Sequence, residues 1–74
     1  MKYVITEHKD FAIFSEVTTH SEIGHTLFGA PTSAGFCHFD DLSKTMQCYG
    51  QSVSIGIGSR PDDSDFLTSK LTDN

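Results

Sequence analysis

Two short runs of β-prone residues open the chain. Residues 2–7 and 11–16 are rich in β-branched and aromatic side chains, and the polar residues 8–10 between them make a connection of hairpin length. Apolar residues fill positions 11–14 without a break, so both faces of the second run are hydrophobic. The pattern predicts an antiparallel β-hairpin whose second strand is covered on both sides.

A short helix is expected next. Thr19 followed three residues later by Glu22 has the form of a capping box, in which a hydroxyl and a carboxylate bind free N–H groups at a helix start. We therefore expect a helix that begins at His20 and ends at Gly29, a residue suited to the left-handed conformation that ends helices. Gly24 weakens this helix, so packing must hold it. Its apolar stripe consists of Ile23, Leu27 and Phe28.

The second half of the chain predicts another hairpin. Residues 33–39 and 46–58 flank the polar turn segment 40–45, and a symmetric register about that turn sets Cys37 directly opposite Cys48. Two further cross-strand pairs follow from the same register, Phe36 with Tyr49 and Phe39 with Met46.

A terminal helix over roughly residues 61–71 completes the predicted fold. Pro61 suits a first helical position, and acidic residues in the first turn complement the helix dipole. The element order is ββαββα. We predict one compact α+β domain over residues 1–74, in which a four-stranded, mainly antiparallel sheet carries two short helices. Helices packed on one face would leave the other sheet face for a different contact.

The run 46–58 alternates two kinds of residue. In a continuous strand, Val53, Ile55 and Ile57 would share the core face. The opposite face would carry no side chain larger than serine, and its five residues are Gly50, Ser52, Ser54, Gly56 and Gly58. Glycine inside a strand is costly unless another backbone, a helix or a ligand comes close. This face therefore predicts close packing by a helix of the chain itself, a subunit interface or a ligand groove.

Composition narrows the function classes. The chain has 74 residues and a net charge of −5. A chain of this length buries only about 60% of the surface that it exposes when unfolded, so its core is marginal and a homo-oligomer is expected. It has no basic stripe to neutralise a run of phosphates, which argues against binding of duplex nucleic acid. No apolar run is long enough to span a membrane or to form a signal peptide, so we expect a soluble cytoplasmic protein.

Ser59 and Arg60 stand where the last strand is predicted to meet the last helix. Arg60 is the single arginine of the sequence, and the free N–H groups of a helix start would lie beside it. Such a corner can hold an anion. Against this, Asp62, Asp63 and Asp65 lie in the same first turn and repel anions, and Ser59 can instead cap the helix. The glycine spacing matches neither the phosphate loop nor the dinucleotide fingerprint.

The sequence predicts no metal site, no cofactor and no catalytic centre. His20 and His25 are five residues apart rather than four, which separates them around a helix and differs from the zinc-protease motif. Cys37, His38 and Cys48 also lack zinc-site spacing. We expect both cysteines to be reduced, although the predicted register permits a disulfide. No nucleophile-elbow pattern singles out a serine.

Three segments of the second half carry a resemblance. They are Ser33-Ala34-Gly35-Phe36, Cys48-Tyr49-Gly50-Gln51-Ser52-Val53-Ser54 and Ser59-Arg60-Pro61-Asp62-Asp63, in this order after the Thr19-His20 helix start. Together they resemble a small family of uncharacterised proteins of phage and prophage genomes. That family has no established activity, so no residue role is transferred. The resemblance implies a small intracellular protein that binds stoichiometrically and either blocks a host defence protein or sequesters a small signalling molecule.

The leading hypothesis is a non-catalytic binding module. It would self-associate through the face of small residues and bind a small anionic, nucleotide-like ligand at the Ser59–Arg60 corner. Other expected lining residues are Tyr49, His20, His25, Ser52, Ser54, Gly56 and Gly58.

A protein-binding inhibitor is the alternative, with an acidic surface that docks on a basic patch of a host protein and imitates nucleic acid. Its acidic residues would be Asp40, Asp41, Asp62, Asp63 and Asp65. A purely structural subunit is the third possibility.

Overall fold

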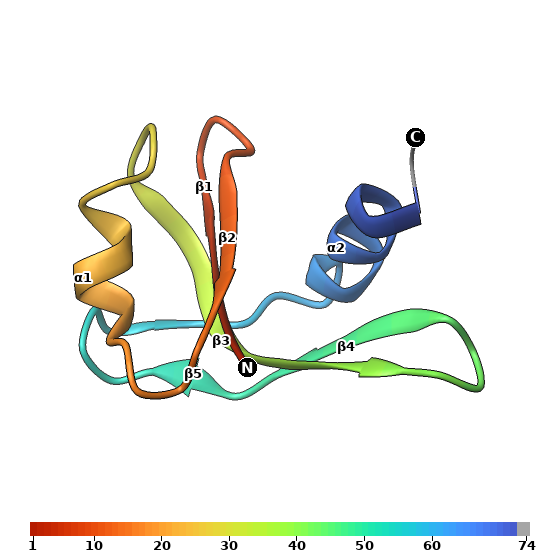
Figure 1. Cartoon of the computed structure of the whole chain (residues 1–74). Coiled ribbons are helices and arrows are strands. Elements are labelled where there is room, and N and C mark those ends of the chain that lie inside the picture. Colours follow the sequence, from red (N-terminus) through yellow and green to blue (C-terminus); the bar gives the residue numbers. More distant parts are fainter. Residues whose placement is uncertain (73–74) are drawn as a thin grey trace.

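A four-stranded antiparallel sheet forms the centre of the molecule (Figure 1). In the computed structural model, which describes residues 1–72, β1 (Lys2–Thr6) pairs with both β2 (Phe11–Phe14) and β3 (Pro31–Asp40), and β3 pairs with β4 (Thr45–Tyr49). The strand order is therefore β2-β1-β3-β4. Both predicted hairpins and the α+β class are confirmed.

The second hairpin has the predicted register. Cys37 lies directly opposite Cys48, and the flanking pairs also match: Phe36 with Tyr49, and Phe39 with Met46. Local sequence is sufficient here because the turn length and the apolar pattern together determine which residues face each other.

The prediction of one continuous strand over residues 46–58 is wrong. The chain leaves the sheet at Gly50, whose φ is +76°, and folds back on itself as a small hairpin of β5 (Gln51–Ser52) and β6 (Ile57–Gly58). Gly56, with a φ of +67°, belongs to the connecting turn. Both conformations are readily accessible to glycine.

The predicted face of small residues consequently does not exist as one side of a strand. Ser52 is buried, whereas Val53, expected in the core, is 88% exposed. The five residues Gly50, Ser52, Ser54, Gly56 and Gly58 are instead distributed around the β5–β6 hairpin. The self-association surface that was based on this face therefore loses its structural basis.

Gly35 explains how the chain can turn away from the sheet. A Cβ atom at this position would lie 2.5 Å from the carbonyl oxygen of Tyr49 and 3.3 Å from the Gly50 backbone. Real Cβ atoms do not approach so closely, so only glycine lets residues 49–50 pass over β3. The close backbone approach expected at the glycines of 50–58 thus occurs at Gly35.

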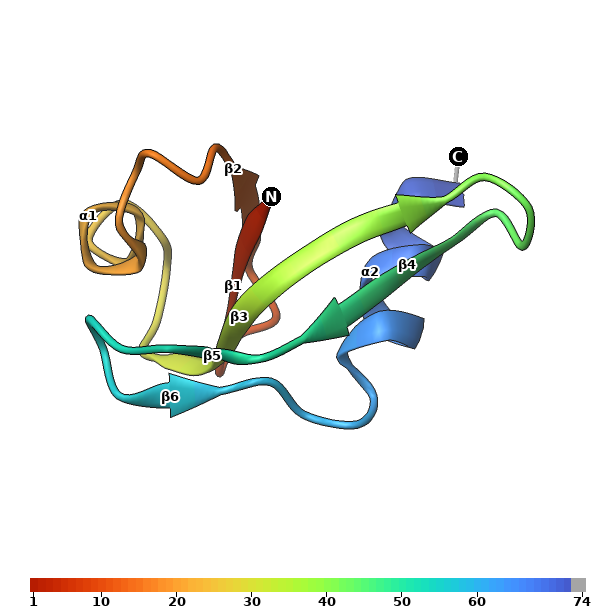
Figure 2. The same ribbon diagram turned by 90° about the horizontal axis from the view of Figure 1, so that it is seen from below.

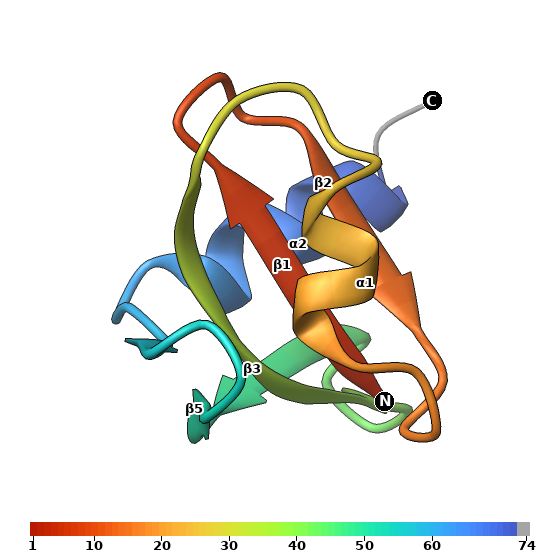
Figure 3. The same cartoon turned by 90° about the vertical axis from the view of Figure 1, so that its left-hand side faces the viewer.

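The two helices lie on opposite faces of the sheet rather than on one face (Figure 3). Helix α2 (Asp63–Thr72) packs over the main core with Leu67, and the sheet residues of this core are Tyr3, Ile5, Cys37 and Met46. Phe66 of α2 contacts Phe11 edge to face at 5.9 Å. The predicted terminal helix is confirmed, with its start at Asp63 rather than residue 61.

Helix α2 also protects the free edge of β4. The N–H groups of Met46 and Cys48 donate to the Thr68 and Ser64 hydroxyls at 2.8 and 2.9 Å. Four helical residues rise about 6 Å and two strand residues about 6.6 Å, so the hydroxyls of α2 match the spacing of these donors. These bonds occupy N–H groups of an edge strand, which could otherwise pair with a strand of another molecule.

Helix α1 (His20–Gly24) begins as predicted but is shorter than predicted. The Thr19 hydroxyl accepts from the Glu22 N–H at 3.2 Å, which confirms Thr19 as the N-cap; the Glu22 carboxylate, expected to bind a backbone N–H, instead accepts from the Thr19 hydroxyl at 3.0 Å. The helix stops at Gly24, and Thr26 turns back onto the Ile23 carbonyl through both its N–H and its hydroxyl. Leu27 and Phe28 therefore lie outside the helix, and the predicted stripe is wrong.

The long strand β3 curves between the α1 end and the β4 end of the molecule (Figure 2). Among the residues that the structure describes, no helix has the length and apolar character needed to cross a bilayer. Gly29 has a φ of +94°, as expected for a residue that redirects the chain, and leads from the α1 region into β3.

Candidate functional site

A row of four side chains crosses the sheet on the face covered by α1. Lys2 lies directly opposite Phe14 on one side and Phe36 on the other, and Phe36 lies opposite Tyr49. Directly opposed residues of antiparallel strands project to the same face. The sheet thus aligns one cation with three aromatic rings.

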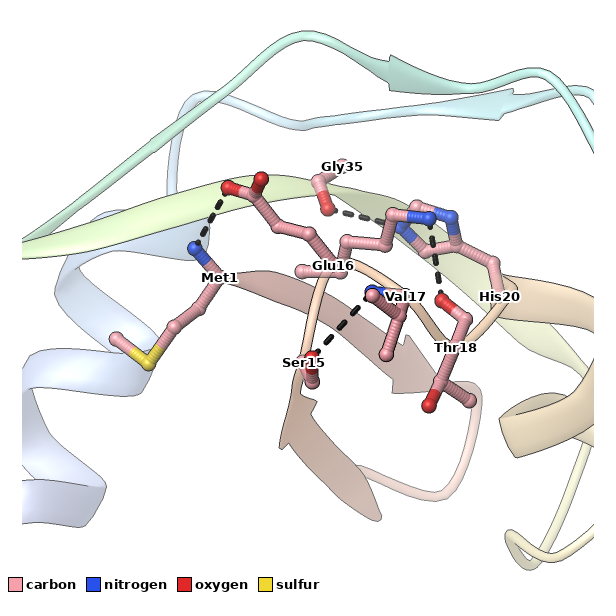
Figure 4. Close-up of polar contacts among 8 residues, drawn as sticks. Met1, Ser15, Glu16, Val17, Thr18, His20 and Gly35 are labelled. Atoms are coloured by element: carbon pink, nitrogen blue, oxygen red, sulfur yellow. Dashed lines mark hydrogen bonds and ion pairs between the residues drawn. The ribbon is translucent and has the colours of Figure 1, made fainter.

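His20 of α1 lies over this row. Its ring contacts Phe14 and Phe36 edge to face, with centroid distances of 5.4 and 6.0 Å. The residue is only 3% exposed, and its Nε2 lies 2.8 Å from the Gly35 carbonyl oxygen (Figure 4). Because a carbonyl can only accept, Nε2 carries the hydrogen. Within residues 1–72, Nδ1 has no hydrogen-bond partner and keeps contact with solvent.

The Lys2 ammonium is held at the edge of the row. Its Nζ donates to the Thr18 carbonyl at 3.1 Å, which uses one of its three N–H groups. The loop that carries Thr18 is attached to the start of β1 a second time, because the amino group of Met1 forms an ion pair with Glu16 at 3.3 Å (Figure 4). The ammonium therefore has a defined position and two donors left for another group.

A hollow of about 290 Å³ opens above these residues, between α1 and the β5–β6 hairpin. We call it the Lys2 hollow, and its lining residues are Lys2, Thr19, His20, Phe36, Gln51, Val53 and Ser54. It offers an ammonium, an amide, two hydroxyls and an imidazole around an aromatic ring. The exposed carboxylate of Glu22 accepts the Thr19 hydroxyl next to this lining.

Aromatic surface continues from the hollow onto β4. The rings of Phe36 and Tyr49 are stacked with centroids 6.0 Å apart and an interplanar angle of 26°. Tyr49 is 51% exposed, and His38 lies beside it at 6.0 Å. Tyr49 therefore forms an accessible aromatic rim next to the Lys2 hollow.

The Ser59–Arg60 corner is filled by a carboxylate of the chain itself. Asp63 is only 4% exposed and accepts hydrogen bonds from the Arg60 N–H at 2.9 Å, the Ser33 hydroxyl at 3.0 Å and the Tyr3 hydroxyl. Ser59 does not cap α2, because its hydroxyl donates to the Gly50 carbonyl at 2.9 Å. The backbone donor expected to hold an external anion is thus already occupied.

Burial of Asp63 also removes it from the predicted acidic docking surface. Asp40, another member of that surface, accepts from the Leu42 N–H and from the Ser43 hydroxyl, each at 3.0 Å. These bonds lower the pKa of Asp40 and tie its carboxylate to its own turn. Two of the five acids therefore have structural roles within the chain.

The structure brings together only part of the predicted site. His20 and Ser54 line the Lys2 hollow, Tyr49 forms its rim, and Ser52 is buried with its hydroxyl 3.3 Å from that of Ser54. His25 lies in a neighbouring hollow. The corner residues Ser59 and Arg60, and the hairpin residues Gly56 and Gly58, do not line the Lys2 hollow.

Lys2 and Phe36 are the main residues that sequence reasoning missed. Phe36 was expected to pair with Tyr49, but its approach to Lys2 depends on the β1–β3 pairing, which joins residues 34 positions apart. A row of aromatic residues at matching register on three strands was the available signal. It becomes visible only when β1 is placed between β2 and β3.

The two cysteines lie on the opposite face, next to α2. Both are free thiols; Cys37 is fully buried and Cys48 is half-buried. Burial raises the pKa of Cys48 to about 11 and also raises the pKa of Cys37. Since the thiolate is the reactive form, neither cysteine is activated as a nucleophile.

Within residues 1–72, no group of three or more histidine, cysteine, aspartate or glutamate side chains is arranged to hold a metal ion. The comparisons with known proteins add no assignment, because no protein-family model, no curated protein and no solved structure matches this chain.

Proposed function

We propose that this chain is a non-catalytic cytoplasmic binding module that sequesters a small anionic ligand with a planar ring, of the nucleotide type, in the Lys2 hollow. The observation that carries the proposal is the row of Phe14, Lys2, Phe36 and Tyr49 with His20 above it. This arrangement puts a cation, hydrogen-bonding groups and aromatic rings around one concave surface, as expected of a small-molecule site.

The polar half of such a ligand fits the Lys2 side of the hollow. Two N–H groups of the ammonium remain after its bond to Thr18. They can donate to a phosphate or carboxylate, and bonds to charged groups are among the stronger ones in proteins. The Gln51 amide and the Ser54 hydroxyl line the same space. The net charge of −5 repels anions, so the Lys2 ammonium supplies the local positive charge that an anionic ligand needs.

The planar half fits the aromatic side. Tyr49 exposes half of its surface while its ring is supported by Phe36. Stacking of a base on an aromatic side chain contributes about 1–3 kcal/mol in single-stranded nucleic-acid binding. Binding of duplex nucleic acid requires a long basic groove, which the sequence lacks. Stacking of a single ring on Tyr49 does not require such a groove.

We propose binding rather than catalysis because the groups that line the Lys2 hollow suit recognition of a ligand. The thiols lie on the other sheet face with raised pKa values. His20 is fixed by Gly35 and two aromatic rings, which suits recognition of a ligand by Nδ1.

Isothermal titration calorimetry with nucleoside monophosphates tests the proposal. Lys2→Met removes the charge and keeps the aliphatic stem, and we expect it to weaken AMP binding at least tenfold. Lys70→Met is the matched control, because Lys70 lies over Phe66 on the α2 side. Arg60→Ala tests the alternative corner and should leave the affinity unchanged.

Two results would count against the proposal. If Arg60→Ala abolishes binding while Lys2→Met does not, the site is the α2 corner. If none of the four common nucleoside monophosphates binds, and native mass spectrometry of the purified protein shows no retained small anion, the chain is not a nucleotide-type binder. The same spectrum gives the number of subunits.

A further inference from the structure

A second hollow of about 260 Å³ lies beside the Lys2 hollow. Its lining is mostly apolar and consists of Ser21, Gly24, His25, Pro31, Ile55 and Ile57. We call it the isoleucine hollow. Both isoleucines are only half-buried, so apolar surface of the hairpin remains uncovered there.

The two hollows follow one seam between the same elements. On the helix side, His20 lines the first hollow and its neighbour Ser21 lines the second; on the hairpin side, Ser54 lines the first and Ile55 the second. The turn between β5 and β6 reaches toward the α1 end of the molecule in two perpendicular views (Figures 1 and 2). The two hollows thus lie between the same elements; one has the Lys2 ammonium in its lining and the other has two isoleucines.

The separation along this seam is short. His20 and Gly24 are one helical turn apart, and four helical residues rise about 6 Å. That length corresponds to one ring or a short chain of carbon atoms. A ligand in the Lys2 hollow would need a substituent of about this length to extend to the isoleucine hollow.

We infer that the two hollows form one amphiphilic groove, and that its ligand carries an apolar substituent next to the anionic ring group. The inference rests on the proposed function, since the anionic group anchors the ligand at Lys2. Ile55, Ile57 and Gly24 then determine specificity by accepting the apolar part. At Gly24 an added Cβ would meet only the Pro31 Cγ, at an ordinary 3.7 Å, so side-chain space is open there.

The experiment compares a plain nucleotide with extended ones. Calorimetry measures the binding of AMP, of N6-benzyl-AMP and of AMP carrying a methylanthraniloyl group on the ribose, so that the substituent is offered from either end. We expect at least one derivative to bind the wild-type protein about tenfold more tightly than AMP, as burial of apolar surface predicts.

Variants test whether the tighter binding of the derivative depends on the isoleucine hollow. Ile55→Ala and Ile57→Ala shrink the apolar wall, and Gly24→Met fills the hollow from the opposite side. Each should abolish the tenfold gain of the derivative and leave AMP binding unchanged. Leu42→Ala, at a 97% exposed position in a distant turn, is the control and should retain the gain. A cooperative thermal transition verifies that each variant is folded, and the helical and hairpin variants test the same hollow independently.

The outcomes distinguish failure of the groove from failure of the Lys2 site. AMP binding with no gain for either derivative overturns the groove while leaving the Lys2 site intact. A gain that survives in Ile55→Ala, Ile57→Ala and Gly24→Met also overturns it. Failure of AMP and of both derivatives to bind overturns the proposed function itself.

Discussion

The Tyr3 hydroxyl donates to the buried carboxylate of Asp63, which joins the first strand to the first turn of the last helix across 60 residues of sequence. Asp63 receives two further bonds, from Ser33 and from the Arg60 N–H. A buried carboxylate is tolerated only when its oxygens are satisfied in this way. The position of α2 on the sheet is therefore coupled to a single acidic residue.

Tyr3→Phe should destabilise the fold while preserving its packing. The ring volume is kept, but Asp63 loses a charge-assisted hydrogen bond, which costs about 1.5–3 kcal/mol in free energy of unfolding. Urea denaturation measures this loss. Ser69→Ala is the control, since the Ser69 hydroxyl is exposed and bonds within α2. Equal stabilities of Tyr3→Phe and the wild type would show that the bond to Asp63 contributes nothing.

Stability should fall at alkaline pH. Burial raises the pKa of Cys48 from an ordinary 9.0 to about 11, so the unfolded chain loses this proton at lower pH than the folded one. The contribution is complete below pH 9 and decreases as the pH rises toward 11. Burial and Asp63 also raise the pKa of Tyr3, which extends the decrease above pH 10. Urea titrations of the wild type and Cys48→Ala between pH 8 and 11 should show a smaller decrease for the variant.

Two glycine substitutions should have opposite effects. Gly24→Ala should stabilise the protein by about 0.5–1 kcal/mol, because alanine favours helix and the new methyl group meets no obstacle. Gly29→Ala should destabilise it, because Gly29 has a φ of +94° and a Cβ there would lie 2.5 Å from the His8 ring. Thermal unfolding of the pair, side by side, checks both signs. A shift in the same direction for both would contradict the local geometry.

The hydroxyls on α2 should protect two particular amides. Thr68→Val and Ser64→Ala each remove an acceptor from an N–H of β4, at a cost of about 1–3 kcal/mol. Hydrogen exchange should accelerate most at Met46 in the first variant and at Cys48 in the second. Uniform acceleration over the whole sheet would instead indicate general destabilisation.

Local pattern was sufficient for the elements but not for their assembly. The hairpin register of Cys37 and Cys48 and the helix N-cap at Thr19 follow from residues close in sequence, and both are confirmed. The turn after Gly50 depends on the absence of a side chain at Gly35, on another strand. Burial of Asp63 likewise depends on Tyr3 and Ser33, which no local pattern connects.

The candidate site was predicted only in part for the same reason. His20, Tyr49 and Ser54 were identified, but the cation beside them is Lys2 rather than Arg60. An arginine at a helix start is a visible sequence signal, whereas a lysine becomes part of a site only through the strands on both sides of it. The Asp63 carboxylate competes for the donor at the visible position.

Gly35 affects both walls of the Lys2 hollow without lining it. On the α1 side, the Gly35 carbonyl accepts a hydrogen bond from His20. On the side of the β5–β6 hairpin, the absence of a Gly35 side chain leaves room for the Tyr49–Gly50 backbone. A methyl group at this α-carbon would push apart the strand that carries Tyr49 and the one that carries Phe36. Gly35 thus determines the width of the Lys2 hollow, although a molecule bound in the hollow would not contact Gly35 itself.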